Sequence, residues 1–238
     1  MTNKKITEGV VDLVFGEAPV SAGFRITNAC ELAGGPIELE FFVEISGGGS
    51  RYLLIPADRM RCRAGEFSFF ATFADVPLAD PFANLPYMGG PAGVVEIAAD
   101  RPWRQPLILN QFVRLEAALC LLEPGAQGQL VVVCRRTLPL AADQNAALAR
   151  ESHAPLVEVQ LALELRRDDA GLAALVEQLI AEVRHGPREQ RERPLSLLLT
   201  LRAPAAIDRW RTLMNHADPA VAERVRQALW MDRNGGGP

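Results

Sequence analysis

The feature that most restricts the fold is an alternation of apolar and acidic side chains over residues 36–46. Neighbouring side chains of a strand point to opposite faces, so this period of two predicts a strand with one face in a core and one in water. The apolar face would carry Ile37, Leu39, Phe41, Val43 and Ile45, and the wet face Glu38, Glu40 and Glu44. The glycine run at 46–50 predicts a tight reversal, with residues 52–55 as the returning strand of a hairpin.

Strand and turn signals recur along the N-terminal part at the spacing of about 8–12 residues that is typical of all-β domains. We expect further strands at residues 59–63, 67–73, 94–98 and 106–110. Between them, four prolines and a Gly-Gly pair in residues 75–92 predict a long ordered loop or a crossover between sheets. Residues 1–140 are therefore predicted to form an antiparallel β-sandwich of about seven to nine strands.

Two strongly apolar runs, residues 112–122 and 129–138, lie on either side of a turn cluster. If they form a hairpin centred near residue 127, Cys120 and Cys134 become cross-strand neighbours, because their numbers are symmetric about that centre. The first run also fits a helix, since short apolar runs do not distinguish the two structures.

The pattern changes after residue 141. Residues 141–152 are rich in alanine and predict a linker or a short helix, and residues 156–166 alternate as a strand does. Residues 170–185 carry apolar side chains at steps of three and four, which predicts an amphipathic helix. Residues 195–201 are interpreted as another strand, so that residues 156–201 would form a strand–helix–strand unit.

Two helices are expected to close the chain. The first begins at Pro204, and the second begins with Asp218 as its cap and Pro219 at its first position. Residues 234–238 are expected to be disordered. Together these signals predict an α+β protein: a β-sandwich domain at residues 1–140, and an α+β C-terminal region at 141–238 that ends in a helical hairpin and packs on the first domain.

The composition and net charge indicate the general class of protein, but they do not identify a function. Hydrophobic residues make up 49% of the chain and charged residues 23%, as in ordinary folded proteins. The formal net charge of -4 argues against nucleic acid as a partner, because phosphate binding relies on a basic surface. We find no signal-peptide core and no apolar run of the roughly 18 residues that a membrane helix needs. A cytoplasmic location is therefore expected, with the cysteines reduced.

Motifs for catalysis, metal binding and phosphate binding are missing from the sequence. The three histidines all lie after residue 150, and no two Cys or His residues lie within four positions of each other. Such spacing predicts neither a nucleophile–base pair nor a zinc site. There is no Walker or dinucleotide-binding glycine pattern. We therefore predict no cofactor, no metal and no catalytic residue.

Arg59, Arg61 and Arg63 are the one candidate binding surface with a regular spacing. In a strand they would project from one face about 6–7 Å apart, where they could bind carboxylates of a partner. They could equally pair with the outward glutamates of residues 36–46, which is a common way to complete a wet sheet face. Trp103, which we expect in a partly exposed loop between prolines, is the second candidate contact, because exposed tryptophan and arginine are typical interface anchors.

These observations favour a non-enzymatic protein-interaction module: a cytoplasmic adaptor, regulator or assembly subunit that binds another protein or a second copy of itself. The alanine-, arginine- and leucine-rich style of the chain is typical of bacterial proteins. The alternative is an enzyme or small-ligand-binding protein whose site is formed by the 75–92 loop and strand ends, with Tyr87, Asp58 and a distant histidine as candidate side chains. A pocket with convergent polar groups would favour this alternative, whereas an apolar patch or an unpaired edge strand would favour the module.

Overall fold

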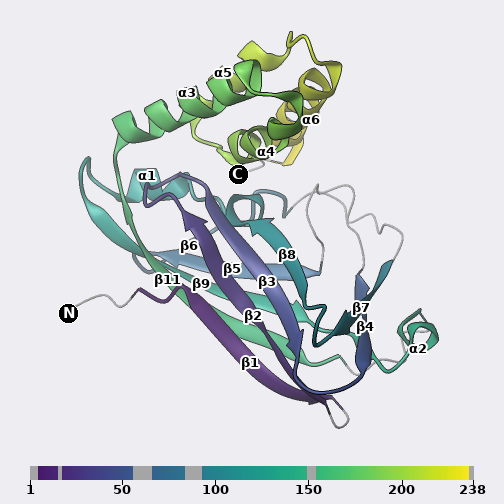
Figure 1. The fold of residues 1–238 in the computed structure, drawn as a ribbon. Helices are drawn as coiled ribbons and strands as arrows, with labels where there is room; N and C mark the ends of the chain where they lie inside the picture. The colour runs from purple at the N-terminus through teal and green to yellow at the C-terminus, as the bar shows by residue number, and fades with distance from the viewer. Residues whose placement is uncertain (1–4, 16–17, 56–65, 84–92, 149–153, 236–238) are drawn as a thin grey trace.

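The computed structural model describes residues 5–15, 18–55, 66–83, 93–148 and 154–235 (Figure 1). Sheets of antiparallel strands combine with helices, so the prediction of an α+β protein is confirmed. No helix in these described ranges is both long enough and apolar enough to span a bilayer. The strands are β1 (Glu8–Phe15), β2 (Ala18–Ala29), β3 (Ile37–Ile45), β4 (Ser50–Ile55), β5 (Phe67–Phe73), β6 (Val76–Leu78), β7 (Gly93–Ala98), β8 (Trp103–Ile108), β9 (Gln127–Thr137), β10 (Leu140–Ala141) and β11 (Leu156–Arg166). The helices are α1 (Ala117–Leu121), α2 (Gln144–Leu148), α3 (Asp169–His185), α4 (Glu192–Thr200), α5 (Pro204–Trp210) and α6 (Pro219–Gly235), with 3-10 turns at 109–111, 188–190 and 211–213.

Two antiparallel sheets, four-stranded within the described residues, face each other across a shared core. Their strand orders are β1-β2-β3-β8 and β11-β9-β5-β6. The alternating run of residues 36–46 forms β3, and all five of its predicted core side chains are buried. Aromatic rings from both sheets meet in this core, where the ring of Phe67 lies 5.9 Å from that of Phe24 and 5.4 Å from that of Phe41.

The two sheets approach each other along one edge, where the N-terminal segment crosses between them. Ile6 exchanges backbone hydrogen bonds of 3.0 and 2.8 Å with Ala162 of β11, and β1, which follows, pairs with β2 of the other sheet. Gly9 permits this approach, because a Cβ at that position would lie only 2.6 Å from the Cβ of Val159. The corner between the sheets thus depends on one residue without a side chain.

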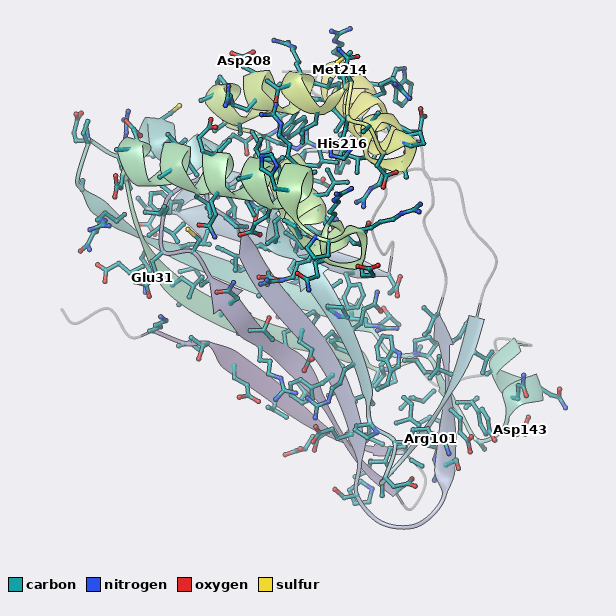
Figure 2. The ribbon with its side chains drawn as sticks, turned by 45° about the horizontal axis from the view of Figure 1, so that its top comes forward. Glu31, Arg101, Asp143, Asp208, Met214 and His216 are labelled. Atoms are coloured by element: carbon teal, nitrogen blue, oxygen red, sulfur yellow. The ribbon has the colours of Figure 1, made fainter. Side chains whose placement is uncertain are left out.

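A smaller sheet, of order β10-β4-β7, overturns the predicted hairpin between residues 36–46 and 52–55. Both edges of β3 are occupied by β2 and β8, whereas β4 pairs with β7 and β10. The glycine run does reverse the chain, with positive φ at Gly47 and Gly49, but it delivers the next strand to a different sheet. Arg101, between β7 and β8, and Asp143, before α2, mark this end of the molecule, far from the helical region (Figure 2).

The expectation that residues 75–92 lack regular structure is wrong for residues 76–78. These form β6, which pairs with β5 through a turn in which Ala74 and Asp75 have φ values of 48° and 66°. Pro77 is tolerated because β6 is the edge strand of its sheet, where a missing N–H need not break a ladder. Residues 84–92 lie outside the described part of the chain.

The predicted hairpin of residues 112–122 with 129–138 is also wrong. The first run contains α1, as the helical alternative expects, and β9 pairs with β5 and β11 instead. Cys120 is consequently exposed on α1, whereas Cys134 is buried between Phe69 and Val159 of the adjacent strands. The prediction paired two runs because they are neighbours in the sequence. It failed because β5 and β11, the strands that pair with β9, come from other parts of the chain.

The predicted strand–helix–strand unit is a strand followed by helices. β11 and α3 agree with the predictions for residues 156–166 and 170–185, but residues 195–201 belong largely to the helix α4. Leu195, Leu197 and Leu198 are all buried there. The polar face of α4 begins with Glu192 and Arg193, which lie outside the run 195–201, so that run by itself did not reveal the helical period.

The closing helices form where the sequence predicts them. α5 begins at Pro204, and α6 begins at Pro219, where the Asp218 carboxylate accepts a 3.0 Å hydrogen bond from the N–H of Ala220. α6 continues to Gly235, which corrects the expected disorder of residues 234 and 235; residues 236–238 are outside the described chain.

Two hydrophobic clusters organise the described residues, one between the sheets and one among α3–α6. They meet where Leu32, Ile108 and Leu119 of the β-rich part pack against the helical cluster. β11, which we assigned to the C-terminal region, pairs with β9 along its whole length, so the two predicted regions share a sheet. The division into domains at residues 1–140 and 141–238 stays a prediction.

Candidate functional site

The arginine stripe predicted as a partner contact, Arg59, Arg61 and Arg63, lies outside the described residues. The glutamates that sheet pairing would have offered it, however, are already bound to other arginines. The pairs are Glu38–Arg193, Glu40–Arg25, Glu40–Arg104 and Glu44–Arg104, with N–O distances of 2.6 to 3.1 Å. Burial alone would raise the pKa of Glu38, but hydrogen bonds from Arg193 and Asn28 outweigh it and lower that pKa.

The three tryptophans occupy three different environments. Trp210 is fully buried in the helical cluster. Trp230 is 54% exposed and lies in α6. Trp103 is partly exposed, as predicted, but it opens β8 rather than lying in a loop, and its ring lies 5.8 Å from that of Phe41. Its position on the inward face of β8 makes Trp103 part of the core margin.

Arg136 is the most unusual side chain that the sequence analysis missed. It is 1% exposed, and its guanidinium carbon lies 4.5 to 4.7 Å from the ring centroids of Phe41, Phe67 and Trp103. Glu66 is the nearest carboxylate, with an N–O distance of 3.7 Å, and within the described chain none of the three guanidinium nitrogens has a hydrogen-bond acceptor. Burial lowers the pKa of Arg136 to about 10 and raises the pKa of Glu66.

A signal for this residue was present in the sequence. Every second residue of β9 lies on the same face of the strand, and four of these residues are buried: Leu130, Val132, Cys134 and Arg136. An arginine that continues an apolar face is unexpected unless rings or a carboxylate receive it. The aromatic rings and the carboxylate of Glu66 are what receive the charge of Arg136 in the described chain.

An apolar cleft of about 450 Å³ opens between α3 and α5. These two helices lie at the end of the molecule away from the smaller sheet of β10, β4 and β7 (Figure 1). Its floor is formed by side chains that are buried or half-buried in the helical cluster and yet border the open volume. They are Leu119, Leu172, Val176, Ala203 and Ala206. Exposed Ala173 lies on its α3 wall, so the entrance is lined by small residues.

The charged residues at the rim of the cleft are bonded to one another. Arg209 of α5 reaches Glu177 of α3 with an N–O distance of 2.5 Å, and Arg167 binds Asp169 at 3.1 Å. Arg167 also donates to the backbone carbonyl oxygens of Leu119 and Leu122. The hydrogen bonds to their carboxylates raise the pKa of both arginines. Each of these four charged residues therefore has an ion-pair partner, and the Nε of Arg209 is the one nitrogen of that residue that is buried without a hydrogen-bond acceptor in the described chain.

Two other hollows are smaller and more polar in character. A notch of about 270 Å³ lies along β11, between Lys5, Glu31 and Arg166, and Lys5 and Glu31 are paired at 2.8 Å. A hollow of about 110 Å³ borders Phe82, whose ring lies 4.6 Å below the guanidinium carbon of Arg202. Phe82 lies near the end of the described part of the 75–92 segment, so this hollow borders the region of the predicted ligand site. Tyr87 and Asp58 are outside the described chain, and that site stays a prediction.

The described residues hold no cluster of metal ligands, and two of their three cysteines have thiols with a raised pKa. No group of three or more His, Cys, Asp or Glu side chains among them is arranged to hold a metal ion. Burial raises the pKa of Cys134 and of Cys30, which disfavours the reactive thiolate form.

Comparison with known proteins adds no functional assignment: no protein-family model matches the chain, and no curated protein matches it either.

Proposed function

We propose that the chain is a non-enzymatic protein-binding module, and that the cleft between α3 and α5 holds a short amphipathic helix of its partner. The observation that supports this proposal most is the combination of an open apolar floor with a rim whose charges are mutually paired. A small-molecule site normally offers a few unpaired polar groups that orient the ligand. A helix-binding groove needs mainly apolar anchor positions.

The dimensions of the cleft support a helix as the occupant. Asp169 and Glu177 mark its two ends along α3, eight residues apart, which corresponds to about 12 Å of helix. An amphipathic helix places anchors at i, i+3 or i+4, and i+7, over about 10.5 Å. Two turns of a partner helix therefore fit between the two ion pairs, with apolar side chains over Leu172 and Val176.

Ala173 and Ala174 provide a matched test of this proposal. Both are exposed on α3, but only Ala173 borders the cleft. Ala173→Arg should block the cleft by volume and charge, whereas Ala174→Arg adds the same charge to the same helix beside it. Tagged wild-type and variant proteins would be used for affinity purification from the native host, with quantitative mass spectrometry of the bound fraction.

We expect one or two proteins to be recovered in stoichiometric amounts by the wild type and by Ala174→Arg, and to be lost with Ala173→Arg. The same recovery with all three baits would place the partner elsewhere and refute the cleft as its site. Recovery of the bait alone in all three would count against a protein-binding module. The next candidate surface would then be Arg59, Arg61 and Arg63, tested by reversing all three to glutamate.

A further inference from the structure

A second surface, on the sheets and apart from the cleft, follows from the position of β1. This strand forms one margin of its sheet (Figure 1). The other margins of the two four-stranded sheets are guarded in the described chain. β8 carries Pro106 and β6 carries Pro77, and β11 is bridged by Ile6 and by Leu32. β1 has eight residues without a proline. β11 lies close to the start of β1, where Gly9 approaches Val159, but no described strand pairs with the outer side of Val10, Asp12 or Val14.

The hydrogen-bond register shows which backbone groups face outward. Thr7 accepts a 2.8 Å bond from Ile26 of β2, whereas the N–H and C=O of Ile6 both bind Ala162 on the opposite side. In an antiparallel ladder the direction of these groups alternates from residue to residue. The N–H and C=O groups of every second residue, from Glu8 to Val14, therefore point away from β2, where a further strand would lie.

The side chains of these same residues form an exposed row: Glu8, Val10, Asp12 and Val14. Val10 is 49% exposed and Val14 is 78% exposed, which are large fractions for valines in a strand. The row thus alternates acidic and apolar groups along an open backbone edge. The two acidic side chains would by themselves repel any strand that carries acidic groups. They do not explain why two valines on the same row are exposed to water.

We propose that the outer edge of β1 binds an extended segment of a partner protein in which basic residues alternate with apolar ones. The open backbone groups fix the occupant as a strand, since only an extended chain can pair with a strand edge. Its basic side chains would lie beside Glu8 and Asp12, and its apolar side chains would cover Val10 and Val14. A second copy of β1 fits less well, because it would bring four carboxylates into one cross-strand ladder.

A labelled peptide tests the edge directly on the full-length protein. The probe is a fluorescein-labelled eight-residue peptide that alternates arginine and valine, and the control peptide alternates glutamate and valine. Fluorescence anisotropy would be measured for the wild type, for Val10→Pro and for Val10→Thr. Proline removes the outward N–H of residue 10 without removing a bond to β2, whereas threonine keeps that donor and the strand propensity.

We expect the wild type and Val10→Thr to bind the arginine peptide equally, and Val10→Pro to bind it at least about tenfold more weakly because a backbone pairing is lost. All three proteins carry the same charge, so equal binding by Val10→Pro would show mere electrostatic attraction and overturn the proposal. Failure of the wild type to prefer the arginine peptide would also overturn it.

If Val10→Pro does not fold, a charge-reversed variant tests whether the outer edge of β1 binds the peptide as proposed. Glu8→Lys with Asp12→Lys should exchange the preference, so that the glutamate peptide binds better than the arginine peptide. An unchanged preference would refute the proposed partner chemistry. If sedimentation instead shows a wild-type dimer that Val10→Pro converts to a monomer, the occupant is a second copy and the proposal is wrong. None of these outcomes depends on the α3–α5 cleft.

Discussion

Replacing Arg136 by methionine should destabilise the protein strongly, although methionine fits a buried position. The substitution leaves Glu66, whose side chain is 6% exposed, without its counter-ion. At the observed N–O distance of 3.7 Å, the attraction between the two charges is worth about 4–5 kcal/mol at an effective dielectric constant of roughly 20. Breaking a buried pair by removing one partner typically costs about 3–5 kcal/mol, so we expect a loss of that size in the free energy of unfolding near pH 8.

The double variant Glu66→Leu/Arg136→Met should recover most of this loss. It removes both desolvated charges and leaves apolar side chains beside the rings of Phe41 and Phe67. Replacing a whole buried pair by apolar residues is commonly neutral or stabilising, so the double variant should lie within about 1 kcal/mol of the wild type. Urea denaturation of the wild type, both single variants and the double variant completes the cycle.

The pH dependence gives the same prediction a second readout. Burial raises the pKa of Glu66 above its ordinary 4.5, so the folded state binds this proton more tightly than the unfolded chain does. Its contribution to stability is therefore complete below pH 4.5 and is lost as pH rises through the folded-state pKa. In Arg136→Met that pKa rises further, because the cation is gone. The cost of the substitution should thus be smaller at pH 5 than at pH 8.

Two results would refute this reasoning. A loss below about 1 kcal/mol for Arg136→Met at pH 8 would mean that the pair is solvated and not buried as the structure shows. A double variant as unstable as the single one would mean that the cost comes from lost packing of the guanidinium on the aromatic rings, not from the orphaned carboxylate. The double variant Glu66→Leu/Arg136→Met is the matched control. Because it lacks the carboxylate, its stability relative to the wild type should not show this additional dependence on pH.

Three further substitutions test the framework of the fold by thermal and urea denaturation. Asp168→Ala should cost about 1 kcal/mol, because its carboxylate accepts a 2.8 Å capping bond from Gly171; an unchanged melting temperature would argue against the cap. Gly9→Ala should cost about 1–3 kcal/mol through its clash with Val159, and Val159→Ala added to it should restore part of that loss. Trp210→Phe should cost about 1–3 kcal/mol, because it loses buried ring volume and the 2.9 Å indole hydrogen bond to the carbonyl oxygen of Leu198, which keeps its 3.1 Å bond from the N–H of Leu201; full stability would contradict that bond.

Sequence periodicity succeeded where an element buries one face and exposes the other. β3, β11 and α3 all agree with their predictions, because alternation and three-to-four spacing depend only on local geometry and on a single core side. It failed for α4, because the run 195–201 is mostly leucine and leaves out the exposed Glu192 and Arg193, which mark the polar face of the helix. It also failed for strand partners: turn chemistry predicted that the chain reverses after β3, but not that β2 and β8 occupy both of its edges.

The candidate sites divide in the same way. The inward position of Arg136 could be predicted from the alternation of side chains along β9. The rings and the carboxylate around it could not, because they come from β3, β5, β8 and the residue before β5. The apolar stripe of α3 was predictable, but not the fact that Leu172 and Val176 also border an open cleft. The exposed row of β1 went unnoticed, because a strand shows its free edge only when its neighbours are known.

By itself, the sequence determined the α+β class, most of the regular elements and the faces that they bury, since these depend on short-range geometry and on the aversion of apolar groups to water. Only the tertiary structure decided which strands pair, which helix faces remain uncovered and which backbone edge stays open. Those features arise from contacts between residues far apart in the chain, and no local pattern encodes the choice among the many partners that would satisfy the same hydrogen bonds and bury the same surface.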